Sequence, residues 1–265
     1  MTALTATYAY GVLESASRLT AGRAPAGVPG ATRPRLMPLH GRLWLIAAEV
    51  PVSVYGENVL NANIRDLEWV SAVAVGHEAV IEHFARLRRA TVAPMKLLTL
   101  FSSEEKARDE LRRRRRELES AIRRIAGCEE WGVRVFASPS AATERTGSAS
   151  APAPRPTSGT AFLAARKAAR DAEKEGRARA LDAAAGVFES LAGFARAAKQ
   201  RPRSSEPGTN PPLLDGAFLV PASSRAGFKR AARRQAAVCA AAGARLTLTG
   251  PWPAYNFVGD SDETA

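Results

Sequence analysis

The string most suggestive of enzyme chemistry is His-Glu-Ala-Val-Ile-Glu-His, residues 77–83. A zinc protease of the His-Glu-x-x-His type needs two imidazoles four residues apart, so that both lie on one helical face beside the catalytic glutamate. Here Ile81 stands at the required position, and the two histidines are separated by about 600° of helical rotation, which points them to different sides. The inverted motif would need a histidine where Ala79 stands. The spacing therefore predicts no zinc site.

The residues around this string favour a structural role for its first histidine. His77 falls on the apolar side of a helical pattern, so we expect a partly buried imidazole with a hydrogen-bond partner. The remaining polar side chains of the string, Glu78, Glu82 and His83, are expected to face water.

Other catalytic patterns are poorly supported. Cys128 precedes Glu129 and Glu130, and neighbouring carboxylates raise the pKa of a thiol, which disfavours the reactive thiolate. Cys239 lies among alanines and is expected in a core. No Gly-x-Ser-x-Gly or Walker A sequence occurs, and the glycines of residues 27–30 lie in a proline-rich loop. The residues therefore predict no catalytic residue, metal or cofactor, and an enzyme of unknown class that uses His77 and Glu78 is kept as an alternative.

Five consecutive arginines, Arg112–Arg116, are the best candidate for nucleic-acid binding. Five helical positions cover about 400° of rotation, so in one continuous helix they surround it and form no single stripe. The segment 104–124 also holds six acids beside its nine bases, and pairs such as Glu110 with Arg113 are spaced to form salt bridges. A solvated, ion-paired helix is favoured, with nucleic-acid binding as the alternative.

The composition leads to the same preference. The 265 residues contain 38 Lys+Arg and 26 Asp+Glu, a formal net charge of +12, but only six of the bases are lysines. Arginine with abundant Ala, Gly and Pro is what a GC-biased coding sequence produces. A hydrophobic fraction of 46% supports a folded core, and two cysteines exclude a disulfide scaffold. The sequence lacks a membrane-spanning apolar run and an N-terminal signal pattern, so we expect a cytoplasmic protein.

Hydrophobic periodicity predicts two small domains of the α+β class. Residues 1–137 read as an N-terminal domain, and we expect Asn63 to open a long helix whose apolar stripe starts at Leu67. Residues 15–40 are expected to form a loop. The predicted strands are 7–13, 43–50, 91–101 interrupted at Pro94, and 131–137, and a helix capped by Ser103 is predicted over 103–126.

Residues 138–158 hold four prolines and five serines without apolar periodicity, and they predict a flexible linker. Residues 159–265 then form the C-terminal domain, with long helices and an aromatic tail. Its predicted elements are a helix over 160–200, a strand over 213–220, a helix from Ser223 or Ser224 to 242, and a strand over 245–249. Each domain is expected to be a mainly antiparallel sheet with helices on one face, in a ferredoxin-like plan.

Several strings, in order, resemble the gas vesicle GvpF/GvpL family. They are Asp-Leu-Glu-Trp at 66–69 followed by His77 and Val80, Pro-Met-Lys-Leu-Leu-Thr-Leu-Phe at 94–101, Glu-Trp-Gly-Val-Arg-Val at 130–135, Ala-Phe-Leu-Val at 217–220 followed by Gly243, and the segment 248–258. The resemblance spans residues 7–258. The second of these strings looks closer to the GvpL branch than to the GvpF branch.

The resemblance implies a non-enzymatic accessory protein of gas vesicle assembly, associated with the vesicle. Members of the family resemble one another in having two α+β domains and in binding the small hydrophobic shell protein GvpA. The role implied is to keep GvpA from aggregating during vesicle nucleation. Other gas vesicle accessory proteins are further expected partners, whereas nucleic acid, membrane and small-molecule substrates are not expected.

Four aromatic residues are the candidates for partner binding. Trp252, Tyr255 and Phe257 lie in a proline-rich tail after the last predicted strand, where aromatic side chains could anchor a partner. Alternatively, the tail folds back and fills the gap between the two domains. Trp69 lies just off the apolar stripe of its helix and is a candidate interfacial residue, whereas Trp131 is expected in a core.

Overall fold

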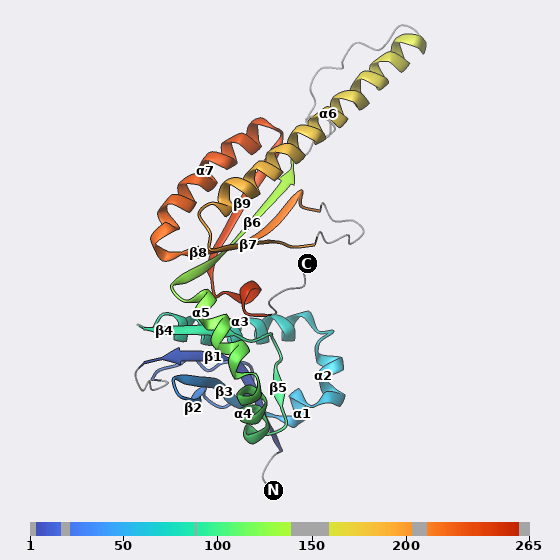
Figure 1. The fold of residues 1–265 in the computed structure, drawn as a ribbon. Helices are drawn as coiled ribbons and strands as arrows, with labels where there is room; N and C mark the ends of the chain where they lie inside the picture. The colour runs from blue at the N-terminus through green and yellow to red at the C-terminus, as the bar shows by residue number, and fades with distance from the viewer. Residues whose placement is uncertain (1–3, 17–21, 88, 139–158, 203–210, 260–265) are drawn as a thin grey trace. The chain divides into compact units, whose positions relative to one another are not determined.

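The computed structural model describes residues 4–16, 22–87, 89–138, 159–202 and 211–259 (Figure 1). The predicted linker thus lies outside the described residues apart from Ser138. Contacts divide the chain into two compact units, one formed by Met1–Glu129 with Trp252–Ala265 and the other by Glu130–Pro251. These boundaries differ from the expected 1–137 and 159–265. The strand that begins at Cys128 joins the second unit because it pairs with that unit's strands, and the aromatic tail belongs to the first unit.

The first unit is a five-stranded sheet in the order β2-β3-β1-β4, with β5 also paired to β1. All of these pairings are antiparallel. The elements are β1 (Thr5–Ser15), β2 (Arg35–His40), β3 (Leu43–Pro51), α1 (Val52–Tyr55), α2 (Glu57–Asn63), α3 (Leu67–Ala85), β4 (Ala90–Pro94), β5 (Leu100–Phe101), α4 (Glu104–Arg113), α5 (Arg115–Ile125) and the tail's short helix η3 (Tyr255–Phe257).

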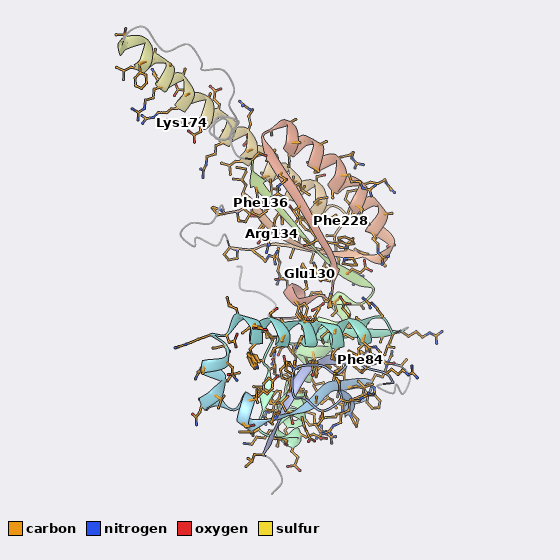
Figure 2. The ribbon with its side chains drawn as sticks, turned by 180° about the vertical axis from the view of Figure 1, so that it is seen from behind. Phe84, Glu130, Arg134, Phe136, Lys174 and Phe228 are labelled. Atoms are coloured by element: carbon orange, nitrogen blue, oxygen red, sulfur yellow. The ribbon has the colours of Figure 1, made fainter. Side chains whose placement is uncertain are left out.

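The central strands of this sheet are buried on both faces. Tyr8 and Ile46 pack on one face against Val80 and Phe84 of α3. Phe84 is labelled in Figure 2. Leu45, next along β3, points to the other face and is equally buried, and α4 and α5 contact β1, β2 and β4. The expectation of helices on one face is therefore wrong for this unit, because both helical layers carry an apolar stripe.

The start of α3 differs from the prediction. Asp66 is the N-cap, and its side chain accepts hydrogen bonds from the backbone N–H groups of Glu68 and Trp69 at 2.9 and 3.3 Å. Asn63 instead ends α2 and donates to the carbonyl of Val54 at 3.0 Å. The helix therefore starts three residues later than expected, which leaves Leu67 in its first turn and 83% exposed.

Two further elements differ from their predictions. Strand β2 lies within residues 15–40, which we expected to be a loop; Pro38 is tolerated because β2 is the edge of the sheet. The single helix expected over 103–126 is broken at Arg114, so α4 and α5 are separate. Ser103 caps α4 as predicted, accepting a hydrogen bond from the N–H of Lys106 at 3.2 Å.

Gly76 of α3 lies close to the backbone of the loop at Gly27, and a substitution there tests how the loop packs on the helix. A Cβ atom there would lie 2.4 Å from the carbonyl oxygen of Gly27 and 2.7 Å from its carbonyl carbon. Because these are backbone atoms, we expect Gly76→Ala to reduce the free energy of unfolding by about 1–3 kcal/mol, measured by urea denaturation. Gly186→Ala on an exposed helical position with no atom within 4 Å is the control, expected to stabilise by about 0.5–1 kcal/mol. Equal stabilisation by both changes would show that the loop does not press on α3.

The second unit is a four-stranded sheet in the order β7-β8-β6-β9. Its elements along the chain are β6 (Cys128–Ala137), α6 (Gly159–Ala192), β7 (Ala197–Gln200), β8 (Leu214–Pro221), the short helix η2 (Ala222–Ser224), α7 (Arg225–Ala241) and β9 (Ala244–Trp252). If these four strands are numbered along the chain and read from the β9 edge, the order is fourth, first, third, second, which is the ferredoxin-like order. The four main strands of the first unit follow the same order, but the described residues 22–34 of its first crossover contain turns and no helix.

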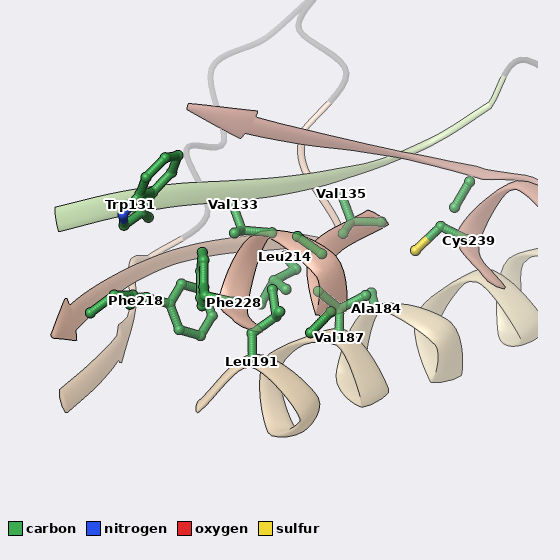
Figure 3. Packing of buried hydrophobic residues seen from close by; sticks show 14 of the residues in the cluster. Trp131, Val133, Val135, Ala184, Val187, Leu191, Leu214, Phe218, Phe228 and Cys239 are labelled. Atoms are coloured by element: carbon green, nitrogen blue, oxygen red, sulfur yellow. The ribbon is translucent and has the colours of Figure 1, made fainter. Parts of the chain in front are cut away.

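The core of the second unit lies between its sheet and the helices α6 and α7 (Figure 3). Trp131, as expected, is buried there, and its ring lies 6.0 Å from that of Phe228. Only the C-terminal part of α6 joins this core, from Ala180 onward. The described side chains of its N-terminal half are exposed, as Lys174 illustrates in Figure 2.

The prediction of the fold class is thus confirmed. Both units are antiparallel sheets covered by helices, and the second carries the long helix. The helix expected over 160–200 ends earlier, at Ala192, because the chain turns there into the short edge strand β7.

Candidate interaction surfaces

The histidine of the enzyme-like string lies in a buried aromatic cluster. His77 is 2% exposed, and its Nδ1 is 2.9 Å from the hydroxyl of Tyr8. The rings of Tyr10 and Tyr255 lie 5.5 and 6.2 Å from the imidazole. Tyr8 also accepts a hydrogen bond from the N–H of Leu98 at 3.2 Å. The prediction of a buried imidazole with a hydrogen-bond partner is confirmed at Nδ1.

Burial shifts the pKa values of this cluster so that its groups are unsuited to acid–base catalysis at neutral pH. It lowers the pKa of His77 to about 4, with the backbone of Met95 acting in the opposite direction, and raises the pKa of Tyr10 to about 12. The pKa of Tyr8 is raised further, again by burial. At neutral pH the imidazole is neutral and the phenols are protonated, so the cluster is suited to holding β1, α3 and the loop before β2 together.

The lowered pKa of His77 makes stability depend on pH. The unfolded state binds a proton below about pH 6.5, whereas the folded state resists protonation until about pH 4. Stability from this residue is therefore present above pH 6.5 and lost as the pH falls towards 4, by at most about 3 kcal/mol. We expect His77→Gln to flatten the pH dependence of the unfolding free energy in that window. An unchanged slope would contradict this assignment.

The aromatic tail packs on the first unit. Tyr255 is half-buried and donates a hydrogen bond to Oε2 of Glu78 at 2.6 Å. Burial raises the pKa of Glu78, and the bond from Tyr255 acts in the opposite direction. Glu78 therefore does not lie on a water-facing side, contrary to the prediction, because the tail covers it.

The four predicted partner-binding residues have different environments. Phe257 is fully buried and Tyr255 is bonded to Glu78, so neither presents a free ring. Trp69 is half-buried, with its ring 5.6 Å from that of Tyr55. Trp252 is 44% exposed and is the only one of the four with an exposed side chain.

Sequence analysis missed a different apolar surface, on α2 and α3. Of the ten large apolar side chains exposed among the described residues, four lie between positions 59 and 75. Two of them, Leu67 and Val75, are 83% and 67% exposed and lie within about 80° of each other around α3. Val75 lies opposite the buried stripe, whereas Leu67 lies at its margin in the first turn of the helix. We call Val59, Ile64, Leu67 and Val75 the α2–α3 surface. Helical angles alone could have separated Val75 from the stripe.

The five-arginine run is largely neutralised by its neighbours. Arg112 pairs with Asp109, Arg113 with Glu110, Arg114 with Glu117 and Arg115 with Glu119, at N–O distances of 2.5–3.6 Å. The prediction of a solvated, ion-paired segment is confirmed, although Arg114 interrupts the helix.

The sheet of the second unit carries a charged cluster on the face opposite α6 and α7. Asp215 accepts hydrogen bonds from Arg134 on β6 at 3.2 Å and from Nε of Arg201, after β7, at 2.9 Å. Phe136 follows Arg134 on the same face of β6, and Figure 2 labels both residues. The ring of Phe136 lies under the guanidinium of Arg245 at 5.6 Å. These contacts join three neighbouring strands and leave Phe136 already covered by a cation.

Groups that could bind a metal or react as thiols are scarce in the described part of the chain. No group of three His, Cys, Asp or Glu residues within it is arranged to hold a metal ion. Cys239 is buried in the second core, where burial raises the pKa of its thiol. No helix among residues 4–16, 22–87, 89–138, 159–202 and 211–259 is long and apolar enough to cross a membrane.

Comparison with known proteins gives one family. Residues 6–259 match the family model described as gas vesicle synthesis protein GvpL/GvpF. Gas vesicle protein L of Streptomyces sp. (strain CB03234) is 30% identical over 239 residues, covering 88% of this chain and 86% of that protein.

Two solved structures share the fold. The gas vesicle protein GvpF of Anabaena sp. PCC7120 superposes with a TM-score of 0.64 at 16% identity, covering 97% of this chain and 98% of that one. GvpF of Microcystis aeruginosa gives a TM-score of 0.61 at 13% identity, covering 96% and 99%. With a family match across both units and a curated relative of nearly the same extent, this chain belongs to the GvpL/GvpF family of gas vesicle proteins.

Proposed function

We propose that this protein is an assembly factor of gas vesicles that binds the hydrophobic shell protein GvpA and keeps it from aggregating during nucleation. Within the family we place it in the GvpL branch, which the curated relative and the string at 94–101 support. Its site of action is the cytoplasm, at the forming vesicle.

The observation that carries the proposal is the α2–α3 surface. Leu67 and Val75 are large apolar side chains left in water, Leu67 in the first turn of α3 and Val75 on the side that faces away from the core. Large apolar side chains that are exposed close together along the chain are candidates for a site of association. A shell subunit with an apolar gas-facing side needs such a cover before assembly, because exposed apolar segments pair with one another.

The modest size of this surface suits a transient holder. Burying four apolar side chains stabilises a complex only modestly. The subunit can therefore be released to the shell by mass action.

Among the described residues on the outer face of the second sheet, the ring of Phe136 is covered by Arg245. The alternative function, nucleic-acid binding by stacking of bases on this ring, therefore has less support.

Direct binding of purified shell protein tests the proposal. Full-length protein immobilised on a sensor should bind solubilised GvpA at low and at high salt, because an apolar contact is not weakened by screening. A DNA duplex is the comparison analyte. Absence of GvpA binding at every salt concentration would overturn the proposal. Loss of binding at high salt alone would show that charged residues, and not the α2–α3 surface, make the contact.

A further inference from the structure

A positively charged surface lies on α7, outside the arginine run that is conspicuous in the sequence. Helix α7 carries five bases and no acid in 17 residues. Arg230, Arg233 and Arg234 are exposed, and none of the three forms an ion pair with any residue that the structure describes. Four arginines of the 112–116 run, by contrast, are paired with acids three or four residues away.

Packing holds these arginines on one side of the helix. Phe228, Ala231 and Cys239 are buried in the core of the second unit, which prevents α7 from rotating. At 100° per residue, positions 229–234 that carry bases span about 140° of the opposite side. Lys229 is one of them, and its Nζ lies 5.7 Å from the ring of the buried Trp131.

The same side of α7 changes character along the helix. After Arg234 the exposed residues are small or apolar, ending with Val238 at 52% exposure. The members of this second half are Ala237, Val238, Ala240 and Ala241. Small side chains let the backbone of a partner protein approach closely. The exposed apolar side chain of Val238 would make no favourable contact with the phosphate backbone of a nucleic acid. The surface therefore combines a cationic half with an apolar half on one helix.

We infer that this side of α7 binds an acidic amphipathic helix of another protein. Carboxylates of the partner would accept paired hydrogen bonds from the guanidinium groups of Arg230, Arg233 and Arg234, since the planar fork of arginine matches a carboxylate. Apolar side chains of the same partner helix would lie over Val238 and its neighbouring alanines, in the manner of helix-on-helix recognition. This surface is separate from the α2–α3 surface and lies on the other unit.

Fluorescence anisotropy with the full-length protein tests the inference. The probes are a labelled amphipathic peptide of glutamate, alanine and leucine, the same peptide with lysine in place of glutamate, and a short DNA duplex. We expect the glutamate peptide to bind best, and Arg230→Glu/Arg233→Glu/Arg234→Glu to weaken it at least about tenfold.

The matched control is Arg166→Glu/Lys167→Glu/Arg170→Glu on the exposed half of α6, which changes the net charge by the same amount. It should change the affinity less than about twofold. Equal losses in both variants, tighter binding of DNA, equal binding of the lysine peptide, or no binding of the glutamate peptide would each overturn the inference. Circular dichroism of both variants checks that the helices are intact.

Discussion

Replacing Phe257 by alanine is expected to reduce the free energy of unfolding of the first unit by about 3–5 kcal/mol. The side chain is fully buried, and the short helix that carries it contacts α5. Truncation leaves a cavity and removes the apolar contact that holds the tail over Glu78. Urea denaturation of the full-length protein, followed by circular dichroism, measures the loss.

Trp252→Ala is the control in the same tail. Its side chain is 44% exposed, so we expect a change within about 1 kcal/mol. If Phe257→Ala left stability unchanged and instead reduced partner binding, the tail would be an anchor for a partner, as one interpretation of the sequence suggests, and its packing on the first unit would be wrong.

The second large effect is expected on binding. Leu67→Glu with Val75→Glu should weaken the affinity for GvpA by about 10- to 100-fold, because the complex would bury two carboxylates against apolar surface. Both residues are exposed, so the unfolding free energy should stay within about 0.5 kcal/mol of its original value. A glutamate in the first turn of α3 is also compatible with the helix dipole. Sensor measurements of affinity and denaturation of the same preparation separate the two effects.

Phe162→Glu with Leu163→Glu is the matched pair. These residues are 53% and 64% exposed on α6, so the same charge is added to apolar side chains of similar exposure on another helix. We expect the affinity for GvpA to change less than about twofold. An equal loss in both pairs would mean that general charge, and not the α2–α3 surface, determines binding.

The elements with strong periodicity were predictable from the sequence. The run 43–50 became β3 (Leu43–Pro51), and the spaced apolar residues before Phe84 became the buried stripe of α3. Here the residue pattern and the tertiary packing favour the same structure. The break at Arg114 was not predictable, since every residue around it is a good helix former and no glycine or proline marks the end.

Edge strands were harder to predict because tertiary pairing creates them. Strand β7, with the sequence Ala-Ala-Lys-Gln, has poor intrinsic strand propensity and exists through its antiparallel pairing with β8. Strand β2 contains Pro38, which argues against a strand unless the edge position is known.

The candidate surfaces depended on similar information. A helical pattern shows which residues are apolar but not where the helix begins. The pattern therefore places Leu67 at the start of the buried stripe, whereas Asp66 caps the helix directly before it and Leu67 is left in water. The partners of the 112–116 arginines follow helical spacing and were predictable in kind. The environment of Phe257 was not, because the tail meets α3 and α5 across a long separation in sequence.

The most direct test of the central claim is the aggregation of purified GvpA, followed by light scattering after dilution from denaturant. We predict that an equimolar amount of this protein suppresses the rise in scattering, that the Phe162→Glu/Leu163→Glu variant suppresses it equally, and that Leu67→Glu/Val75→Glu does not. Scattering that rises at the same rate with and without the unaltered protein would contradict the claim that it holds the shell protein before assembly.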